Sequence, residues 1–393
     1  MRRIAKPALA TLAAALLLPL FAAPAFAATS TPARLGVNSS AAAKAQPLTD
    51  LAVSAGQVYS SYGDFDRNIG PVDLSSVDVS TGAETKHLTV EGEELKALRV
   101  FDRAVYTADI DPRTAWTANT GFASNGSGSW AYNAVTPFIH VFDVAKSGGE
   151  LFLAGSVVNP DKKKYGPAPY LAAVKKSSDG GRTWTIERAR ASASGSNDAD
   201  RYYWLAAASS GRVAAIAEVR DAKGAPNRIL DVYSAGRWSS IDLGSSAGYA
   251  MVHDPADVEV LGSRILIARY NSLVYIDLDA KGKTGGVKFA RWPGDVGIAD
   301  ITVSNGIAYA VGKRMAGTGI DHGTNLVYAS RDGVTWSQVA APAVLPPTTY
   351  WDHGDGTMIP GYGAYTSIAV AGGRMYLGGT DAGVYEAAAP LVP

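Results

Sequence analysis

A short hairpin pattern repeats seven times along the chain, and this repeat constrains the fold more than any other feature of the sequence. Each copy has an alternating apolar segment, a turn of about two to four residues rich in Gly, Ser, Asn or Asp, and a second apolar segment. This pattern is typical of two antiparallel strands joined by a tight turn. The copies lie at 51–63, 98–109, 141–156, 205–218, 258–269, 301–312 and 368–379.

The spacing of the copies predicts how they assemble. Equivalent second-strand residues recur on average every 53 residues or so, close to the roughly 40 to 50 residues of a four-stranded propeller blade with long loops. No segment has the apolar periodicity of an amphipathic helix of about 12 residues or more. The sequence therefore predicts an all-β chain that folds as a single seven-bladed β-propeller. Six or eight blades, or a β-sandwich or solenoid with uneven hairpins, are the alternatives.

The first 27 residues have the pattern of a secretory signal peptide. Arg2, Arg3 and Lys6 precede an apolar run over 8–23, and small residues follow at 25 and 27. The run is shorter than the roughly 20 residues that cross a bilayer. We therefore expect a bacterial protein that is secreted or held in the periplasm or cell envelope, with no membrane span. The expected order is a signal peptide at 1–27, a flexible leader at 28–50 and the propeller at 51–393.

The composition narrows the chemistry that the chain can perform. It has no cysteine, which excludes disulfides, thiolate nucleophiles and Cys-ligated metals. Its 36 basic residues balance 36 acidic ones, with no basic stripe beyond Lys162–Lys164, so nothing predicts a nucleic-acid partner. With 47% hydrophobic and 18% charged residues the chain can bury a large core. We expect a monomer without cofactor or bound metal.

Two segments carry the most specific motif in the sequence. Ser177–Trp184 fits the pattern S-x-D-x-G-x-T-W at every fixed position, and Ser330–Trp336 fits it with one residue deleted. Degenerate relatives lie at 125–130 and 234–238. These segments resemble Asp-boxes, and the chain is similar to the Asp-box (BNR-type) β-propeller superfamily, which includes sialidases, xyloglucanases, sortilin-type receptors and photosystem assembly factors.

The resemblance implies a structural role for the residues of the two boxes. An Asp-box is a turn in which the aspartate accepts hydrogen bonds from backbone N–H groups, Gly takes a positive φ, and Thr and Trp hold the turn against its blade. In these families the turn joins the two outer strands of a blade, on the face opposite the active site. The residues concerned are Asp179, Trp184, Asp332 and Trp336.

Polar and aromatic residues gather on the other face, which we call the loop-rich face, where the segments before and after each hairpin emerge. Four of the five histidines fall in these segments, and the two richest loops are 109–134 and 346–363. Loops of this length are usually functional. Aromatic rings that stack on a ligand, beside carboxylates and imidazoles, suit a glycan or a peptide. The candidate ligand-binding residues are Asp64, Arg67, Asn68, Arg113, His140, Tyr350, Trp351, Asp352 and His353.

Catalytic and metal-binding motifs are weaker. The first repeat lacks the Arg-Ile-Pro motif with which sialidases hold the substrate carboxylate; the nearest strings, at 228–230 and 264–266, lie mid-chain on predicted strands. No G-x-S-x-G elbow is present, the histidines lack metal-ligand spacing, and 64–75 lacks the Gly and Glu positions of a calcium loop. We therefore expect a sialidase-like fold without the sialidase motif set.

The function expected from the sequence is binding of an extracellular glycan or protein on the loop-rich face. Two alternatives are a glycoside hydrolase or lyase of the same superfamily, and a structural or assembly factor. Whether the chain is an enzyme stays open at this point.

The last blade predicts where the ring closes. The seventh hairpin is followed by one strand at about 383–387, so a fourth strand is missing. Residues 33–37 can supply it as an outer strand, which closes the ring and removes two exposed edges. Closure there places 346–363 against 64–68, the junction at which we expect the ligand.

Overall fold

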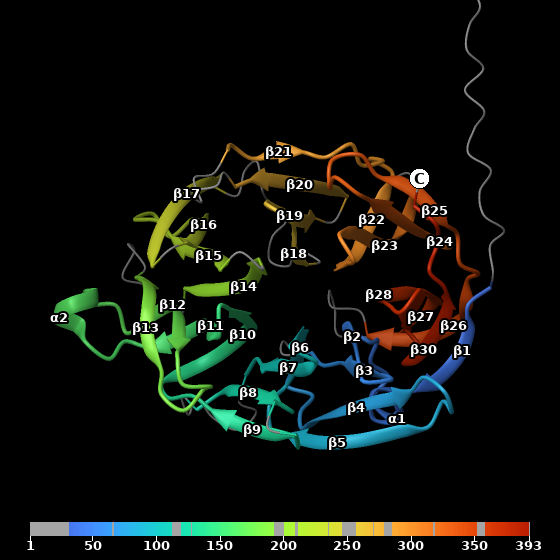
Figure 1. Ribbon diagram of the computed structural model, residues 1–393, viewed down its shortest axis with the longest axis horizontal. Coiled ribbons are helices and arrows are strands. Elements are labelled where there is room, and N and C mark those ends of the chain that lie inside the picture. The colour runs from blue at the N-terminus through green and yellow to red at the C-terminus, as the bar shows by residue number, and fades with distance from the viewer. Residues whose placement is uncertain are drawn as a thin grey trace, which may run out of the picture.

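The computed structural model describes residues 31–64, 67–111, 119–126, 128–191, 200–208, 211–234, 236–245, 257–269, 271–278, 285–316, 319–351 and 358–392. Within these ranges the chain is nearly all-β and forms a ring of seven four-stranded blades around a central channel (Figure 1). In six of these sheets the four strands are consecutive in the chain and lie in chain order from the channel outward. The seventh sheet has the order β28, β29, β30 and β1. The predicted seven-bladed β-propeller is confirmed.

The first four blades use consecutive strands. Blade 1 contains β2 (Asp50–Ser54), β3 (Gln57–Ser61), β4 (Val72–Asp78) and β5 (Glu84–Val90). Blade 2 contains β6 (Leu95–Phe101), β7 (Ala104–Asp109), β8 (Gly121–Ser124) and β9 (Ala131–Ala134). Blade 3 contains β10 (Phe138–Ser147), β11 (Glu150–Val158), β12 (Tyr170–Ser177) and β13 (Thr185–Arg190), with the short helix α2 (Lys162–Tyr165). Blade 4 contains β14 (Arg201–Ala208), β15 (Arg212–Arg220), β16 (Pro226–Ser234) and β17 (Arg237–Ser245).

The remaining blades include the two ends of the described chain. Blade 5 contains β18 (Val258–Leu261), β19 (Arg264–Arg269), β20 (Ser272–Asp277) and β21 (Lys288–Phe289). Blade 6 contains β22 (Val296–Ser304), β23 (Ile307–Ala316), β24 (Gly319–Ser330) and β25 (Ser337–Ala340). Blade 7 contains β28 (Tyr365–Ala371), β29 (Arg374–Gly379), β30 (Gly383–Ala388) and β1 (Ala33–Val37). A separate pair, β26 (Leu345–Trp351) and β27 (Met358–Gly363), lies between blades 6 and 7 in the chain.

The seven hairpins predicted from sequence are the two inner strands of the seven blades. In blades 1, 2, 3, 6 and 7 both central residues of the connecting turn have a positive φ, as at Asn305 and Gly306. Such turns match the right-handed twist of the strands they connect. We call the face that carries these turns the turn face. The connections from the third to the fourth strand of each blade emerge on this face as well.

The two box motifs form turns between third and fourth strands, as the resemblance implies. The Asp179 carboxylate accepts the backbone N–H groups of Arg182 and Thr183 at 3.0 and 2.9 Å, and the Trp184 indole donates to the carbonyl of Gly181. In blade 6, Asp332 accepts the N–H groups of Val334 and Thr335, both at 2.8 Å, and the Trp336 indole donates to Gly333. These contacts hold each turn in shape and leave the aspartates no direct part in a ligand site on the loop-rich face.

Residues 33–37 lie where the sequence predicts a closing strand. They form β1, which pairs antiparallel with β30 and completes blade 7 (Figure 1). The chain then enters α1 (Ser39–Ala43), whose first turn is capped by Asn38: its Oδ1 accepts the N–H of Ala41 at 2.9 Å, and its Nδ2 donates to Ser60 of blade 1. Leu48 is fully buried. The stretch 31–50, expected as a flexible leader, thus contributes a strand, a helix and core side chains.

Apolar side chains fill the spaces between neighbouring blades. One cluster joins Trp204 and Ile216 of blade 4 to Val258 and Ile265 of blade 5, and comparable clusters join the other blades. Because each blade buries both of its faces against its neighbours, its strands are apolar on both sides. No helix in the described part of the chain is long and apolar enough to cross a membrane.

Candidate functional site

The first strand of each blade faces the channel, and one strand position carries an unusual set of residues. Four residues before the end of these strands, blades 1, 3, 5 and 6 each have an aspartate. Because side chains alternate along a strand, the residue two places later lies on the same face. There, most blades have alanine or threonine, whereas blade 2 has Arg99 and blade 5 has Glu259. The residues at the first position are Asp50, Ala97, Asp143, Trp204, Asp257, Asp300 and Ser367.

Three of these aspartates tie one blade to the next. Asp50 accepts the N–H of Leu98 in blade 2 at 2.7 Å. Asp143 accepts the N–H of Leu205 in blade 4 at 2.8 Å, and Asp300 accepts that of Ile368 in blade 7 at 2.8 Å. Each carboxyl thus satisfies a backbone donor that the curved ring would otherwise leave unpaired at the channel wall.

Strand irregularities precede two of the carboxyls that face the channel, those of Asp143 and Asp300. The pairing register of β10 shifts between Val141 and Asp143, and that of β22 shifts between Ile298 and Asp300. Such a bulge inserts an extra residue and re-aims the side chains that follow it. Glycine stands opposite each bulge because there is no room for a side chain: a Cβ on Gly155 would lie 1.9 Å from the carbonyl oxygen of His140.

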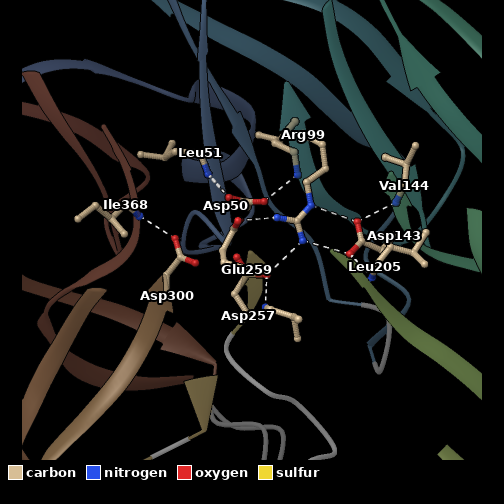
Figure 2. A network of polar contacts seen from close by, with 12 residues as sticks. Asp50, Leu51, Arg99, Asp143, Val144, Leu205, Asp257, Glu259, Asp300 and Ile368 are labelled. Carbon is tan, nitrogen blue, oxygen red and sulfur yellow. Dashed lines mark hydrogen bonds and ion pairs between the residues drawn. The ribbon is translucent and has the colours of Figure 1, made fainter. Parts of the chain in front are cut away.

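Arg99 is the cation at the centre of these carboxyls (Figure 2). Its Nε and Nη2 donate to the two oxygens of Asp143 at 3.2 and 3.1 Å, a bidentate pair. Nη1 donates to Glu259 at 2.8 Å and Nη2 also donates to Asp257 at 3.2 Å. We call Arg99 and the five surrounding acids the channel cluster; the acids are Asp50, Asp143, Asp257, Glu259 and Asp300.

The channel cluster holds five carboxyls and one guanidinium, and four of the five carboxyls resist ionisation. Burial raises the pKa of Asp50 to about 7, and the Asp257 carboxylate adds to the rise. Burial raises the pKa of Glu259 to about 8, and it also raises the pKa of Asp257. The pKa of Asp300 is raised well above its ordinary value, first by burial and then by the negative charges of Asp50 and Asp257.

The channel cluster lies between two cavities. One, of about 620 Å³, opens on the turn face and is lined by the first strands and by hairpin residues such as Asp102 and Gly148. The other, of about 350 Å³, lies toward the loop-rich face, since residues 47–49 ahead of β2 line it. We call the second the mouth cavity. Its lining includes Asp50, Lys96, Phe142, Trp204, Asp257 and Asp300.

A second cluster of polar side chains surrounds His140, which lies on β10 in blade 3. Its Nε2 lies 3.1 Å from Asp111 and its Nδ1 lies 2.6 Å from the Ser156 hydroxyl. Ser156 is completely buried, so this Ser-His-Asp chain presents no nucleophile to a substrate. Burial lowers the pKa of His140, and the charge of Arg201 lowers it further. Nearby, burial raises the pKa of Asp109 to about 7, although the hydrogen bond from Tyr132 at 2.6 Å lowers it.

The residues that the sequence predicts as ligand-binding fall into three sets. Asp64 and Arg67 form an ion pair at 3.6 Å next to Asn68, and His140 lies in the interior group just described. Tyr350 and Trp351 lie on β26, but their side chains are outside the described part of the structure. Arg113, Asp352 and His353 lie outside the described residues altogether. The contact between 346–363 and 64–68 therefore stays a prediction.

Neither the channel cluster nor the mouth cavity is among the sequence predictions. Within the described ranges, no three His, Cys, Asp or Glu side chains are arranged to hold a metal ion.

Comparisons with known proteins support the fold and go no further. No protein-family model matches the chain, and no curated protein matches it. The RRP9 WD40 repeats superpose with a TM-score of 0.51 at 11% identity, covering 89% of this chain and 92% of that one. The polysaccharide lyase Uly1 gives 0.49 at 10% identity, over 87% and 90%. The extracellular domain of a putative hybrid two-component system from B. thetaiotaomicron gives 0.49 at 12% identity, over 91% of this chain and 39% of that chain.

Proposed function

We propose that the protein binds an extracellular glycan or protein ligand on its loop-rich face, with the mouth cavity at the centre of the site. The observation that carries this proposal is the cavity itself, a hollow of about 350 Å³ in which carboxyls converge beside Phe142 and Trp204. Concave sites of this size, with apolar walls and a few convergent polar groups, are typical of ligand binding. The extracellular setting rests on the signal peptide expected at 1–27.

The surroundings of the cavity support a ligand larger than the cavity alone. Arg67, which is partly exposed and pairs with the buried Asp64, follows the inner strands of blade 1, and β26–β27 adds a hairpin that is not part of any blade. In a propeller, such additions on one face enlarge the surface that a glycan or protein can contact. Tyr350 and Trp351 on this hairpin are the aromatic groups that we expect to stack on it.

A hydrolase or lyase is the second candidate, and one observation favours it. Asp109 has a pKa raised to about 7, so it holds its proton near neutral pH, as a general acid must. Asp111 lies two residues further on and contacts His140. Against this, Asp109 is only 3% exposed, so little of its carboxyl is open to a substrate.

One screen separates the two functions. The mature protein is applied to a glycan array and to a library of extracellular proteins, and every glycan bound is assayed for release of reducing or unsaturated ends. Binding without turnover is the result we expect. Replacement of Arg67 on the loop-rich face by alanine should weaken that binding, whereas Lys146→Ala on the turn face should not. Turnover that is lost in Asp109→Asn would establish the enzyme instead.

A further inference from the structure

Asp300 is a buried carboxyl that lines the mouth cavity and has no cationic partner in the described structure. The residue is 4% exposed, and one of its oxygens accepts the Ile368 N–H at 2.8 Å. Within the described ranges this is its one hydrogen bond, and Figure 2 shows its other oxygen turned away from Ile368. A carboxylate buried in this way is costly unless a cation pairs with it.

The neighbours of Asp300 increase the need for a cation. Asp50 on β2, Asp257 just before β18 and Glu259 on β18 face it, and the negative charge of each opposes its ionisation. From β28 it receives only the backbone N–H of Ile368, and Arg99 on β6 is occupied by the carboxylates of Asp143, Asp257 and Glu259. The mouth cavity as a whole is lined by four acidic residues and one lysine, Lys96.

The walls of the cavity favour an organic cation over a metal ion. Phe142 and Trp204 are among the residues that line the cavity, and Trp204 occupies the strand position that carries aspartate in four other blades. Aromatic rings beside carboxyls attract ammonium groups through both charge and the ring quadrupole. A metal ion needs several ligands at close range, and the described acids are not arranged to provide three.

We propose that the mouth cavity holds a protonated primary amine carried by the ligand, with its ammonium group against Asp300. This inference rests on the proposed function, because it names the part of the glycan or protein that enters the cavity. An amino sugar and a lysine side chain both present this group.

Amine binding to such a site must release protons. In the empty cavity the raised pKa of Asp300 makes its carboxyl hold a proton more tightly than a free carboxyl does, and the pKa values of Asp50 and Glu259 beside it are raised to about 7 and about 8. An ammonium group stabilises the ionised form, so the carboxyl proton leaves to solvent as the ion pair forms. The positive charge of the ammonium group also favours the ionised forms of Asp50, Asp257 and Glu259, so their carboxyls release protons as well. The affinity for an amine therefore increases as the pH rises from 6 to 8.

The test uses butylammonium chloride as the probe in isothermal titration calorimetry. Titrations at pH 7 in two buffers of different ionisation enthalpy measure the protons released. The controls are sodium chloride at equal ionic strength and butanol, which has the same chain without the charge. We expect binding of butylammonium alone, with net proton release, and an affinity at least about tenfold lower in Asp300→Asn. Asp102→Asn, which removes an exposed carboxyl on the turn face, should bind as the wild type does.

A measurement on the unaltered protein covers the case in which Asp300→Asn misfolds. Nuclear Overhauser effects from the butyl protons should reach the Trp204 ring, assigned by comparison with Trp204→Phe. Equal binding of butanol and butylammonium, binding without proton release, or wild-type affinity in a folded Asp300→Asn would each overturn the proposal.

Two further arms identify the source of the amine and keep this inference apart from the proposed function. Glucosamine is compared with N-acetylglucosamine, and a lysine peptide with its acetyl-lysine form; loss of binding on acetylation in one pair names the source. If a ligand from the screen binds the loop-rich face but butylammonium neither binds nor competes, the proposed function stands and the amine site fails. If butylammonium binds but no macromolecular ligand is found, the reverse holds.

Discussion

The guanidinium of Arg99 and the carboxylate of Glu259 meet at 2.8 Å inside the channel, although 160 residues separate them in the chain. Arg99 belongs to blade 2 and Glu259 to blade 5, so the pair spans the ring. The same guanidinium contacts Asp143 of blade 3. One cation therefore links three blades through the channel, in surroundings where it is outnumbered by carboxyls.

Replacing Arg99 by methionine should destabilise the protein strongly at alkaline pH. The substitution leaves Asp143, Asp257 and Glu259 buried without their cation, and breaking a buried pair in this way costs about 3 to 5 kcal/mol. The loss should be smaller at pH 5, where Asp257 and Glu259, whose pKa values are raised, can take up protons. Urea unfolding of the wild type and variant at pH 5 and pH 8.5 measures both values. Lys146→Met, which breaks an exposed pair with Asp102, should cost less than about 1 kcal/mol at either pH.

The wild-type protein should be more stable near pH 5 than at pH 8.5. In the unfolded chain Asp and Glu titrate near 3.8 and 4.5, whereas in the folded protein Asp50 titrates near 7 and Glu259 near 8. The folded state binds these protons more tightly, so the stability they confer is complete below the unfolded pKa values and is lost as the pH rises through 7 to 8. We expect a fall in unfolding free energy on the order of 3 kcal/mol.

Asp300→Asn provides the control for this pH dependence. Asparagine keeps an oxygen for the Ile368 N–H but carries no charge, so the variant should be more stable than the wild type at pH 8.5 and should show a flatter pH profile. A wild-type stability that increases from pH 5 to pH 8.5 would contradict the raised pKa values in the channel cluster.

The tryptophans of the two box turns should contribute to stability and not to binding. Trp336 is 6% exposed, so Trp336→Ala should lower the unfolding free energy by roughly 3 to 5 kcal/mol. Trp184 is only partly buried, and its replacement should cost less, since less apolar surface is returned to water. Chemical denaturation measures the two costs. A larger loss in Trp184→Ala than in Trp336→Ala would show that burial does not set the difference.

Removal of residues 28–40 should lower the melting temperature by several degrees. The deletion removes β1 and exposes β30 as an edge, and it also removes the hydrogen bond from Asn38 to Ser60 that connects this segment to blade 1. Differential scanning calorimetry of the truncated and mature proteins provides the comparison. Arg34→Ala, which removes only a half-exposed side chain from β1, should melt close to the wild type. An unchanged melting temperature in the deletion would mean that β1 does not close the ring.

Much of the architecture was readable from the repeat. Residues 33–37 could be assigned to the last blade because that blade lacks a strand, and the box turns could be placed because their spacing follows the hairpins. The aspartates of the channel cluster also share one position, four residues before the end of the first strand of their blades. The sequence prediction does not include this position.

Other features depend on geometry that the repeat does not encode. Arg99 lies at a strand position occupied by alanine or threonine in most blades, but the pattern does not reveal which carboxyls it reaches across the channel. The bulge before Asp143 changes which side chains enter the channel, and the alternation of residues gives no sign of it. His140 could be assigned to the correct region from its place before a hairpin, whereas its burial beside Ser156 follows from cross-strand pairing.

The most direct test of the central claim compares substitutions on the two faces of the propeller. Using whichever ligand the screen identifies, dissociation constants are measured for Arg67→Ala and Trp351→Ala on the loop-rich face and for Asp102→Ala and Trp184→Ala on the turn face, after each variant is shown to be folded. We predict that at least one loop-rich-face variant binds about tenfold or more weakly, since a contact worth about 1.4 kcal/mol changes affinity by that factor, and that the turn-face variants bind as the wild type does. Full binding by both loop-rich-face variants, together with a loss in either turn-face variant, would place the ligand on the opposite face and contradict the account.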